Sequence, residues 1–563
     1  MSTATRVLGI EGTAWAASAA VYDSGRDGVD SVFIETDAYE PDSGGIHPRE
    51  AAEHMHDAIP RVVERALEHA RETRDGDDER SSPVDAVAFS RGPGLGPCLR
   101  VVATAARALS QTLDVPLVGV NHMVAHLEIG RHASGFDSPV CLNASGANAH
   151  LLAYRNGRYR VLGETMDTGV GNAIDKFTRH VGWSHPGGPK VEATAEDGEY
   201  VDLPYVVKGM DFSFSGIMSA AKQAYDDGVP VEDVCYSLQE NVFAMLTEVS
   251  ERALSLTGSD ELVLGGGVGQ NARLREMLAA MCDQRAASFH APEPRFLRDN
   301  AGMIAVLGAK MYDAGDTLAL EDSRVDPNYR PDQVPVRWRS DEGNVAIGSD
   351  DGRIRGAEAV VDLEPAAGRV TKRRREKRYR HPALDERLRR ERTTLEARLT
   401  SLARREGVPT PVLSDVDPLE ARLEFEYVGE SDLREGLTAE RVRDVGRHLA
   451  RIHRAGFVHG DPTTRNVRVG RGRASSNERP ADVRTEGGER TYLIDFGLGY
   501  HTDHVEDYAM DLHVFDQSLV GTATDPEPLR EAVREGYREV GDESVLERLR
   551  DVEGRGRYVE DGT

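Results

Sequence analysis

The sequence predicts an α/β protein whose first part consists of duplicated halves and whose second part is a smaller α+β domain. Residues 9–22 and residues 141–154 share the pattern strand, tight turn, strand, and each opens a run of alternating strands and helices. Small and hydroxyl residues at both turns would let backbone amides approach a phosphate. We therefore expect duplicated halves facing each other across a cleft, with unrelated hairpins as the alternative.

The length and the composition limit the class of protein. A chain of 563 residues is too long for a single core, so two or three domains are expected. No stretch reaches the roughly 18 apolar residues of a membrane span. Because a strand begins by Val7, we expect no signal peptide, no membrane partner and a cytoplasmic location. The scattered cysteines form no C-x-x-C pair and are predicted to be reduced core residues: Cys98, Cys141, Cys235 and Cys282.

The chain is strongly acidic, with 96 acidic residues against 69 basic ones and a net charge of -27. Such a composition resembles a halophilic proteome, although a solvated acidic surface kept for solubility is its ordinary meaning. A nucleic-acid partner would need a local basic patch to overcome the repulsion. Residues 369–392 are densely basic, and both a solvated helix face and a contact with a nucleic-acid backbone would explain them.

Two histidines four residues apart indicate a metal site. His122 and His126 follow the apolar run 115–120, so both would project from the first turns of a helix at the carboxyl end of a strand. Capping or half-buried histidines are the alternative. A zinc peptidase would need Glu directly after the first histidine, where this chain has Met123. Downstream, Asp299 at a helix start is either a simple cap or the oxygen ligand of a His/His/Asp site.

Two glycine-rich turns lie between predicted strands and helices. Residues 89–100 would form the floor of a small substrate site. Residues 262–274 are an apolar strand that breaks into three consecutive glycines and continues as a helix capped near Asn271. A turn of this second kind can lie against an adenosine.

Residues 1–340 resemble the universal tRNA threonylcarbamoyladenosine synthase family, the catalytic subunit of KEOPS. The resemblance rests on G-I-E-G-T-A (9–14), N-H-M-V-A-H (121–126), G-N-A-I-D-K-F (171–177) and D-N-A-G-M-I-A (299–305), with support from 185–192 and 211–216. It implies the duplicated actin/Hsp70/sugar-kinase-like fold, one iron or zinc ion and a bound adenylate.

The resemblance also implies roles for individual residues. His122, His126 and Asp299 would be the metal ligands. The nucleotide would be held by Asp167, Gly171, Asp175, Gly188, Glu192 and Asn271. Asn143 stands at the cofactor site where archaeal relatives often have a tyrosine ligand, so water or substrate would take the place of the phenolate.

Residues 350–563 carry two motifs of protein-kinase folds in the expected order. V-H-G-D-P-T-T-R-N (458–466) matches a catalytic loop, and Y-L-I-D-F-G (492–497) matches a metal-binding loop. By role, Lys372 on the third strand would contact the nucleotide phosphates, Glu396 would pair with it, and Asp461 would be the base. Asn466 and Asp495 would hold magnesium.

This second domain is a reduced version of the kinase pattern. Its phosphate loop, residues 355–359, keeps only Gly356, and no activation segment follows Asp495. With K-R-Y-R-H-P-A-L-D (377–385), it resembles the small KEOPS kinase-like ATPase. Residues 341–349 are predicted to be a linker and residues 471–490 an exposed, mobile insertion. Relatives often end in a longer basic tail than R-G-R-Y-V-E-D-G-T (555–563), which argues against a tail contact with tRNA.

The two resemblances together imply transfer of a threonylcarbamoyl group from threonylcarbamoyl-AMP to N6 of the adenosine next to the anticodon, in tRNAs that read codons beginning with A. ATP hydrolysis or serine kinase activity in the second domain, with magnesium, would support it. Expected partners are tRNA, other KEOPS subunits and an upstream synthase of the adenylate. The alternatives are a metallopeptidase of the glycoprotein endopeptidase type, a protein-serine kinase with a nucleotide-binding regulatory domain, and an ATP-gated scaffold that binds nucleic acid.

Overall fold

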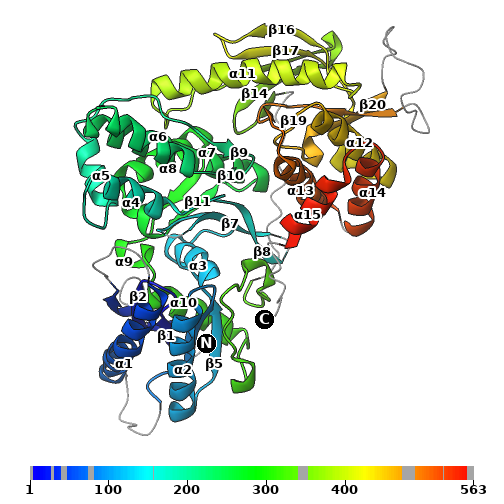
Figure 1. Cartoon of the computed structure of the whole chain (residues 1–563). Helices are drawn as coiled ribbons and strands as arrows, with labels where there is room; N and C mark the ends of the chain where they lie inside the picture. Colours follow the sequence, from blue (N-terminus) through cyan, green and yellow to red (C-terminus); the bar gives the residue numbers. More distant parts are fainter. Residues whose placement is uncertain are drawn as a thin grey trace. The chain divides into compact units, whose positions relative to one another are not determined.

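A computed structural model of the chain describes residues 4–26, 31–39, 47–73, 82–146, 148–155, 157–339, 353–471, 489–523 and 525–554. The chain divides into two compact units (Figure 1). The first unit comprises Met1–Ala346 together with Arg378–His381, and the second comprises Ile347–Lys377 and Pro382–Thr563. The predicted linker 341–349, the tail 555–563 and residues 472–488 of the predicted insertion lie outside the described residues.

The first sheet of the first unit has five strands in the order β3-β2-β1-β4-β5. Its first three strands are antiparallel neighbours: β1 (Arg6–Glu11), β2 (Ala16–Asp23) and β3 (Val32–Ala38). The remaining two run parallel to β1: β4 (Ala86–Gly92) and β5 (Leu117–Asn121). Strands β1, β4 and β5 are buried almost throughout, as expected for strands covered on both faces, whereas the edge strand β3 is mostly half-buried or exposed.

The second sheet repeats this plan, with the order β12-β11-β6-β7-β8. Its antiparallel strands are β6 (Val140–Ala144), β7 (Ala149–Arg155) and β8 (Arg158–Glu164). Its parallel strands are β11 (Glu261–Gly265) and β12 (Ser288–His290). Each half is therefore a three-stranded antiparallel meander extended by two parallel strands, and both predicted hairpins are observed.

Helices cover both faces of both sheets. Alternate residues of β1 point to opposite faces of the sheet and belong to different hydrophobic cores. Leu8 and Ile10 pack in the core with α1 (Pro48–Glu72) and α2 (Gly96–Leu113). Val7 packs in the core with α3 (His122–Ser134) and α10 (Ala301–Asp313). Cys141 and Val263 of the second sheet join that same core of α3 and α10. These two helices consequently occupy the layer between the sheets (Figure 1).

The far side of the second sheet carries the remaining helices of the first unit. They are α4 (Val170–His180), α5 (Gly188–Ala195), α6 (Ser215–Asp226), α7 (Val231–Thr257) and α8 (Ala272–Arg285). The short elements β9 (Val207–Lys208), β10 (Asp211–Phe212) and α9 (Pro294–Leu297) complete the unit. Helix α7 is buried on nearly all sides, so its many polar residues must find partners inside the protein.

Residues Arg378–His381 supply some of those partners. We predict 350–563 as one continuous domain, whereas this tetrapeptide groups with the first unit. Tyr379 belongs to the core around α7, and the Arg380 guanidinium pairs with the buried carboxylate of Glu248. The His381 ring stacks on Tyr200 at 4.4 Å between ring centroids.

The second unit begins with a five-stranded antiparallel sheet in the order β13-β14-β15-β17-β16. The strands are β13 (Arg353–Arg355), β14 (Ala359–Glu364), β15 (Arg369–Arg374), β16 (Leu413–Asp417) and β17 (Arg422–Glu426). The long helix α11 (Pro382–Arg405) packs against this sheet through Ala397, which joins Leu423 and Phe425 in one small core.

The rest of the second unit is mainly helical. Its helices are α12 (Ala439–Arg454), α13 (Val505–Thr522), α14 (Glu527–Arg538) and α15 (Glu543–Gly554). Two small sheets hold the loops between them: β18 (Ser431–Asp432) with β20 (Val467–Arg471) and β21 (Glu489–Leu493), and β19 (Phe457–Val458) with β22 (Tyr500–His501). Strands β20 and β21 are antiparallel partners on either side of the predicted insertion.

Two general expectations are met. All four cysteines are free and buried. Among the described residues, no helix is long and apolar enough to cross a membrane.

The close approach of β1 to α10 requires a glycine at position 9. A Cβ added to Gly9 would lie 2.5 Å from the Ala301 carbonyl oxygen and 2.7 Å from the Ala305 nitrogen. We expect Gly9→Ala to lower the free energy of unfolding by about 1–3 kcal/mol, because two backbones must separate to admit the methyl group. Gly216→Ala is the control, since a Cβ there meets no atom within 4 Å. Urea unfolding of both variants tests this, and equal midpoints would contradict it.

Asp211 makes the stability of the first unit depend on pH. Burial raises its pKa from 3.8 to about 6 with a further contribution from the Glu164 carboxylate, and the hydrogen bond from the Glu164 amide at 2.9 Å opposes both effects only in part. A raised pKa favours folding at low pH, and this contribution is lost as pH rises from 3.8 through about 6.

We therefore expect Asp211→Asn to stabilise the chain at about pH 7 by on the order of 1 kcal/mol, and to change little at about pH 4. Asparagine keeps an oxygen for the Glu164 amide and removes the charge. Thermal melts at both pH values check this. A gain of the same size at both would mean that the charge is not the cause.

Candidate functional site

Helix α3 begins where strand β5 ends, and this junction presents both histidines. The Asn121 side chain caps the helix by accepting from the Val124 amide at 3.1 Å, and its amide nitrogen donates to the Tyr329 carbonyl at 2.8 Å. His122 and His126 lie one turn apart on α3, with ring centroids 4.9 Å apart and nearly perpendicular planes. The predicted helix and its shared histidine face are thus observed.

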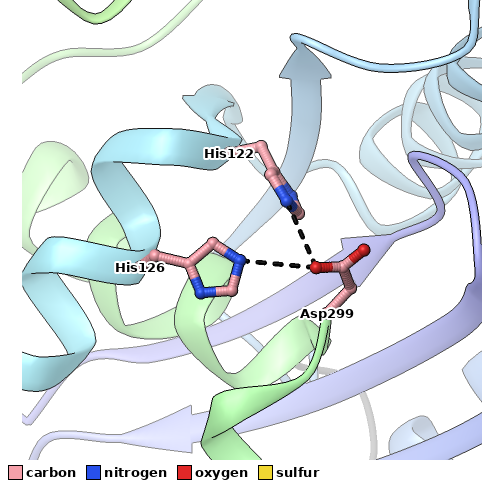
Figure 2. Close-up of side chains that lie close together, drawn as sticks. All are labelled: His122, His126 and Asp299. Carbon is pink, nitrogen blue, oxygen red and sulfur yellow. Dashed lines mark ion pairs between the residues drawn. The ribbon is translucent and has the colours of Figure 1, made fainter. Parts of the chain in front are cut away.

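Asp299 faces both imidazoles. Its Oδ1 atom lies 3.4 Å from Nε2 of His122 and 3.4 Å from Nε2 of His126 (Figure 2). Asn300, not Asp299, is the N-cap of α10, because its side chain accepts from the Met303 amide. The cap alternative for Asp299 is therefore wrong, and its carboxylate remains available as an oxygen ligand.

The three side chains fit a metal ion. Their donor atoms lie within 4.8 Å of one another, and two imidazole nitrogens with one carboxylate oxygen suit zinc or iron. His122 is oriented through its other nitrogen, since Nδ1 lies 3.2 Å from Oε2 of the buried Glu11. Glu11 itself accepts from the Thr13 amide at 2.8 Å and from the Ser90 hydroxyl.

The electrostatics of this group keep its carboxylate ionised. Burial opposes ionisation, but the imidazoles of His122 and His126 hold the pKa of Asp299 far below its usual value. Burial likewise disfavours a charged His122, yet Glu11 and Asp299 raise the pKa of His122 well above its usual value. Burial lowers the pKa of His126, whose side chain is 1% exposed. Asp299 and His126 therefore have the protonation that metal binding needs, whereas His122 must lose a proton to bind a metal.

Among the described residues, four buried side-chain atoms at and near His126 have no hydrogen-bond partner: Nδ1 of His126, Oδ1 of Asn143 and both ring nitrogens of His150. Asn143 and His150 are direct partners across strands β6 and β7. Burial, together with the nearby His126 and His122, lowers the pKa of His150 to about 3, so its ring is neutral. The sequence prediction includes Asn143 and misses His150, although cross-strand register in the predicted hairpin would have indicated it.

The six predicted nucleotide residues lie on or beside α4, α5, α6 and α8. Asp167 accepts from the Ser213 hydroxyl at 2.6 Å and from the Phe214 and Ser215 amides at 3.1 and 2.9 Å. Although burial opposes it, these hydrogen bonds lower the pKa of Asp167 to about 2. Its carboxylate therefore stays charged at the start of α6.

Three of the other predicted nucleotide residues form hydrogen bonds with neighbouring segments of the first unit. Asp175 accepts from the Gly187 amide at 2.8 Å, beside Gly188. Glu192 accepts from the Ala272 amide at 2.8 Å, beside Asn271. Asn271 caps α8 through the Leu274 amide, as predicted, and donates to Gln239 at 3.0 Å. A Cβ on Gly171 would lie 2.7 Å from Gly146 Cα, so α4 meets the β6–β7 turn, whereas one on Gly188 would meet open space.

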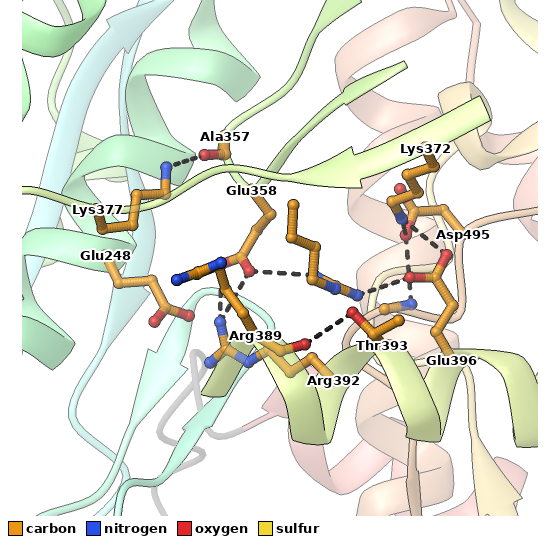
Figure 3. Close-up of polar contacts among 12 residues, drawn as sticks. Glu248, Ala357, Glu358, Lys372, Lys377, Arg389, Arg392, Thr393, Glu396 and Asp495 are labelled. Atoms are coloured by element: carbon orange, nitrogen blue, oxygen red, sulfur yellow. Dashed lines mark hydrogen bonds and ion pairs between the residues drawn. The ribbon is translucent and has the colours of Figure 1, made fainter. Parts of the chain in front are cut away.

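The second unit brings the predicted Lys372, Glu396 and Asp495 together (Figure 3). The Lys372 ammonium donates to Glu396 Oε1 at 2.7 Å and to Asp495 Oδ1 at 2.6 Å. Burial disfavours charge on both partners, but their attraction raises the pKa of Lys372 and lowers that of Asp495 to about 2. Gly356 closes a tight turn in the predicted phosphate loop, donating its amide to the Ala359 carbonyl at 2.9 Å.

The predicted catalytic loop is held by a residue that the sequence did not reveal. Asn466 donates to Oδ2 of Asp461 at 3.0 Å and to the Asp461 carbonyl at 2.8 Å. The buried Asp511 of α13 accepts from the amides of His459 and Gly460, each at 2.8 Å. Asp511 lies outside both motifs, so no local pattern marks it.

The structure removes part of the basic run 369–392 from the predicted nucleic-acid surface. Lys372, Arg374, Lys377 and Arg380 are buried, and Arg374 and Arg380 pair with carboxylates. These side chains cannot contact the phosphate backbone of a nucleic acid, so a contact through the exposed members of the run stays a prediction. The basic residues of the run that are exposed are Arg369, Arg373, Arg378 and Arg390. Reversing the charge of Arg374 would therefore break an internal ion pair instead of testing tRNA binding.

These observations define a two-unit α/β protein with a His/His/Asp group that could hold a metal ion in the first unit and a Lys/Glu/Asp cluster in the second. Residues 29–306 match the family model described as tRNA N6-adenosine threonylcarbamoyltransferase. The chain is 70% identical to a probable bifunctional tRNA threonylcarbamoyladenosine biosynthesis protein of Haloarcula marismortui, over 98% of this chain and 100% of that relative.

Proteins of the same name show similar coverage. That of Halobacterium salinarum is 68% identical over 99% of both chains, and that of Methanospirillum hungatei is 49% identical over 98% of this chain and 99% of its own. The chain therefore belongs to the family of bifunctional tRNA threonylcarbamoyladenosine biosynthesis proteins.

The histidine pair allows a test of the metal site. We expect His126→Ala and His122→Ala to lose the metal that purifies with the unaltered chain, because each removes one of three ligands. His132→Ala is the control, since this exposed histidine lies in the last turn of the same helix. Elemental analysis after gel filtration measures the metal. Folded His122 and His126 variants that retain stoichiometric metal would show the assignment to be wrong.

Proposed function

We propose that the first unit transfers the threonylcarbamoyl group of threonylcarbamoyl-AMP to N6 of the adenosine adjacent to the anticodon, in tRNAs that read codons beginning with A. The single observation that carries this proposal is the meeting of His122, His126 and Asp299 in a chain of the threonylcarbamoyladenosine biosynthesis family. The two sheets of matching order support an actin/Hsp70/sugar-kinase-like duplication.

The residues of the site have separate tasks in this reaction. His122, His126 and Asp299 would hold zinc or iron, which when bound supplies Lewis acidity toward a carbonyl or phosphoryl oxygen. Glu11 fixes the orientation of His122 through Nδ1. Asp167, Gly171, Asp175, Gly188, Glu192 and Asn271 would position the adenylate. Asn143 provides a carboxamide oxygen where a phenolate ligand is common in relatives, and this buried oxygen has no protein partner.

The chemistry is an acyl transfer. The N6 amine forms a bond to the carbamoyl carbon, the bond from that carbon to the phosphate oxygen breaks, and AMP leaves with the electron pair while N6 loses a proton. Backbone amides of the glycine-rich turns would stabilise the departing phosphate. A peptidase reaction lacks its general base, because Met123 follows His122.

The second unit would hydrolyse ATP in the manner of the small KEOPS kinase-like ATPase. Lys372, held by Glu396, would contact the phosphates, Asn466 and Asp495 would bind magnesium, and Asp461 would orient water. Water is the favoured acceptor because the glycine loop is reduced and no activation segment follows Asp495. Since both units belong to one chain, hydrolysis would act on the first unit or its tRNA, with product release as the coupled step. Other KEOPS subunits and an adenylate synthase upstream are the proposed partners.

Nucleoside mass spectrometry of tRNA incubated with threonylcarbamoyl-AMP tests the transfer directly. Asp461→Asn should depress multiple-turnover modification by about tenfold or more and leave a single turnover nearly unchanged, since only the coupled step is affected. Metal content and tRNA binding should remain as in the unaltered chain.

Asp503→Asn is the control, because its side chain is 96% exposed in the same unit. If Asp461→Asn abolishes ATP hydrolysis but modifies tRNA at the normal multiple-turnover rate, the coupling is refuted while the transfer activity stands. Radioactive phosphate on a serine of the complex would instead establish kinase activity.

A further inference from the structure

The buried carboxylate of Glu396 has two cationic partners, one on each oxygen. Lys372 donates to Oε1 at 2.7 Å, and Nη2 of Arg374 donates to Oε2 at 2.6 Å. Glu396 is 1% exposed and Arg374 is 3% exposed at the side chain, so neither has water as an alternative partner. The kinase motif accounts for Lys372 and leaves Arg374 without an assigned role.

Lys372 cannot be the only cation paired with Glu396 while ATP binds and is hydrolysed. Its ammonium is already shared with Asp495 at 2.6 Å, and bound phosphates would compete for the same donor. A buried carboxylate that loses its only cation is strongly destabilised. Arg374 removes this conflict, because Glu396 keeps a charge-assisted partner when Lys372 turns toward the phosphates.

Arg374 also connects Glu396 with the loop over the phosphates. Its Nη1 atom donates to Oε2 of Glu358 at 3.3 Å, and Nη1 of Arg392 donates to both oxygens of Glu358 at 2.9 and 2.8 Å. Figure 3 shows the Glu358 carboxylate next to Arg392 of α11. Glu358 belongs to the loop 355–359, which has one glycine, so ion pairs hold this loop in place.

A glycine close to Arg374 supports the same arrangement. A Cβ on Gly497 would lie 2.6 Å from Nη2 of Arg374 and 2.9 Å from Oδ1 of Asp495. The turn after Asp495 therefore packs directly against the Arg374 guanidinium. Arg374 thus contacts three of the elements assigned to the nucleotide site: the loop through Glu358, helix α11 through Glu396 and the predicted metal-binding loop at Gly497.

We propose that Arg374 is a positioning residue of the second unit: it holds Glu396 and the loop 355–359 in place and so frees Lys372 for the nucleotide phosphates. This inference rests on the proposed function, in which the second unit binds and hydrolyses ATP. It predicts a specific defect. Without Arg374, Glu396 retains Lys372 as its sole cation, so ATP must compete with a buried carboxylate for the ammonium.

The experiment measures kcat and KM for ATP on the full chain, without tRNA. Arg374→Met should raise KM by about tenfold, the loss expected when one charge-assisted hydrogen bond must be broken for binding. Arg422→Met is the control, because this half-buried arginine lies on the neighbouring strand β17 and also contacts two carboxylates, Asp415 and Glu424. The control should keep the KM of the unaltered chain.

A second variant separates positioning from general damage. Replacing Glu396 with the neutral glutamine removes the demand for a cation, so Arg374→Met together with Glu396→Gln should have a lower KM than Arg374→Met alone. If Arg374→Met does not fold, Arg374→Lys is compared with Arg422→Lys, and a KM raised only in the former is expected.

The outcomes distinguish the positioning role of Arg374 from the proposed ATP hydrolysis by the second unit. Equal KM values for the Arg374 and Arg422 variants, in a chain that hydrolyses ATP, overturn the role of Arg374 and leave the proposed function intact. An additive double variant also overturns it. An unaltered chain that shows no ATP binding by calorimetry overturns both.

Discussion

The approach of Asp299 to His122 and His126 is the interaction on which the first unit depends. Its Oδ1 atom is 3.4 Å from both Nε2 atoms, which requires the start of α10 to meet the start of α3 in the layer between the two sheets. That meeting is possible because β1 carries Gly9 where α10 crosses it, and because Asn121 and Asn300 cap the two helices locally. The candidate site therefore lies at the starts of two helices, where asparagine side chains already accept hydrogen bonds from amides of the first turn.

A common device stabilises the buried carboxylates of both units. Glu128 accepts from Lys310 at 2.7 Å and from Tyr159 at 2.7 Å, and Glu396 accepts from Lys372 and Arg374. Each carboxylate has more than one donor, so the loss of a single donor does not leave an unpaired buried charge. Within the basic run 369–392, four basic side chains are buried, and those of Lys372, Arg374 and Arg380 pair with buried carboxylates in this way. This explains why a basic run in the sequence is a poor guide to a nucleic-acid surface.

Local patterns predicted most of the fold and both histidines of the candidate metal site, and left Asp299 open between a helix cap and a ligand. The hairpins at 9–22 and 141–154 are observed, as are the helix at His122 and the capped helix at Asn271, because alternation, helical spacing and capping residues act within a few neighbours. His150 and Asp511 were missed for the opposite reason. His150 is indicated only through its pairing with Asn143 across β6 and β7, and Asp511 acts from a distant helix and lies outside both motifs.

The sequence by itself determined which chemistry was available: two histidines on one helical face, glycines where strands end, and the lysine and aspartates of a phosphate-binding unit. Only the tertiary structure decided which groups meet. In the structure Asn300 caps α10, and the Asp299 carboxylate therefore faces the imidazoles. The Arg374 side chain is buried and donates to Glu396. The physical reason is that periodicity is a property of neighbouring residues, whereas the pairing of a buried charge is set by whichever distant segment packs against it.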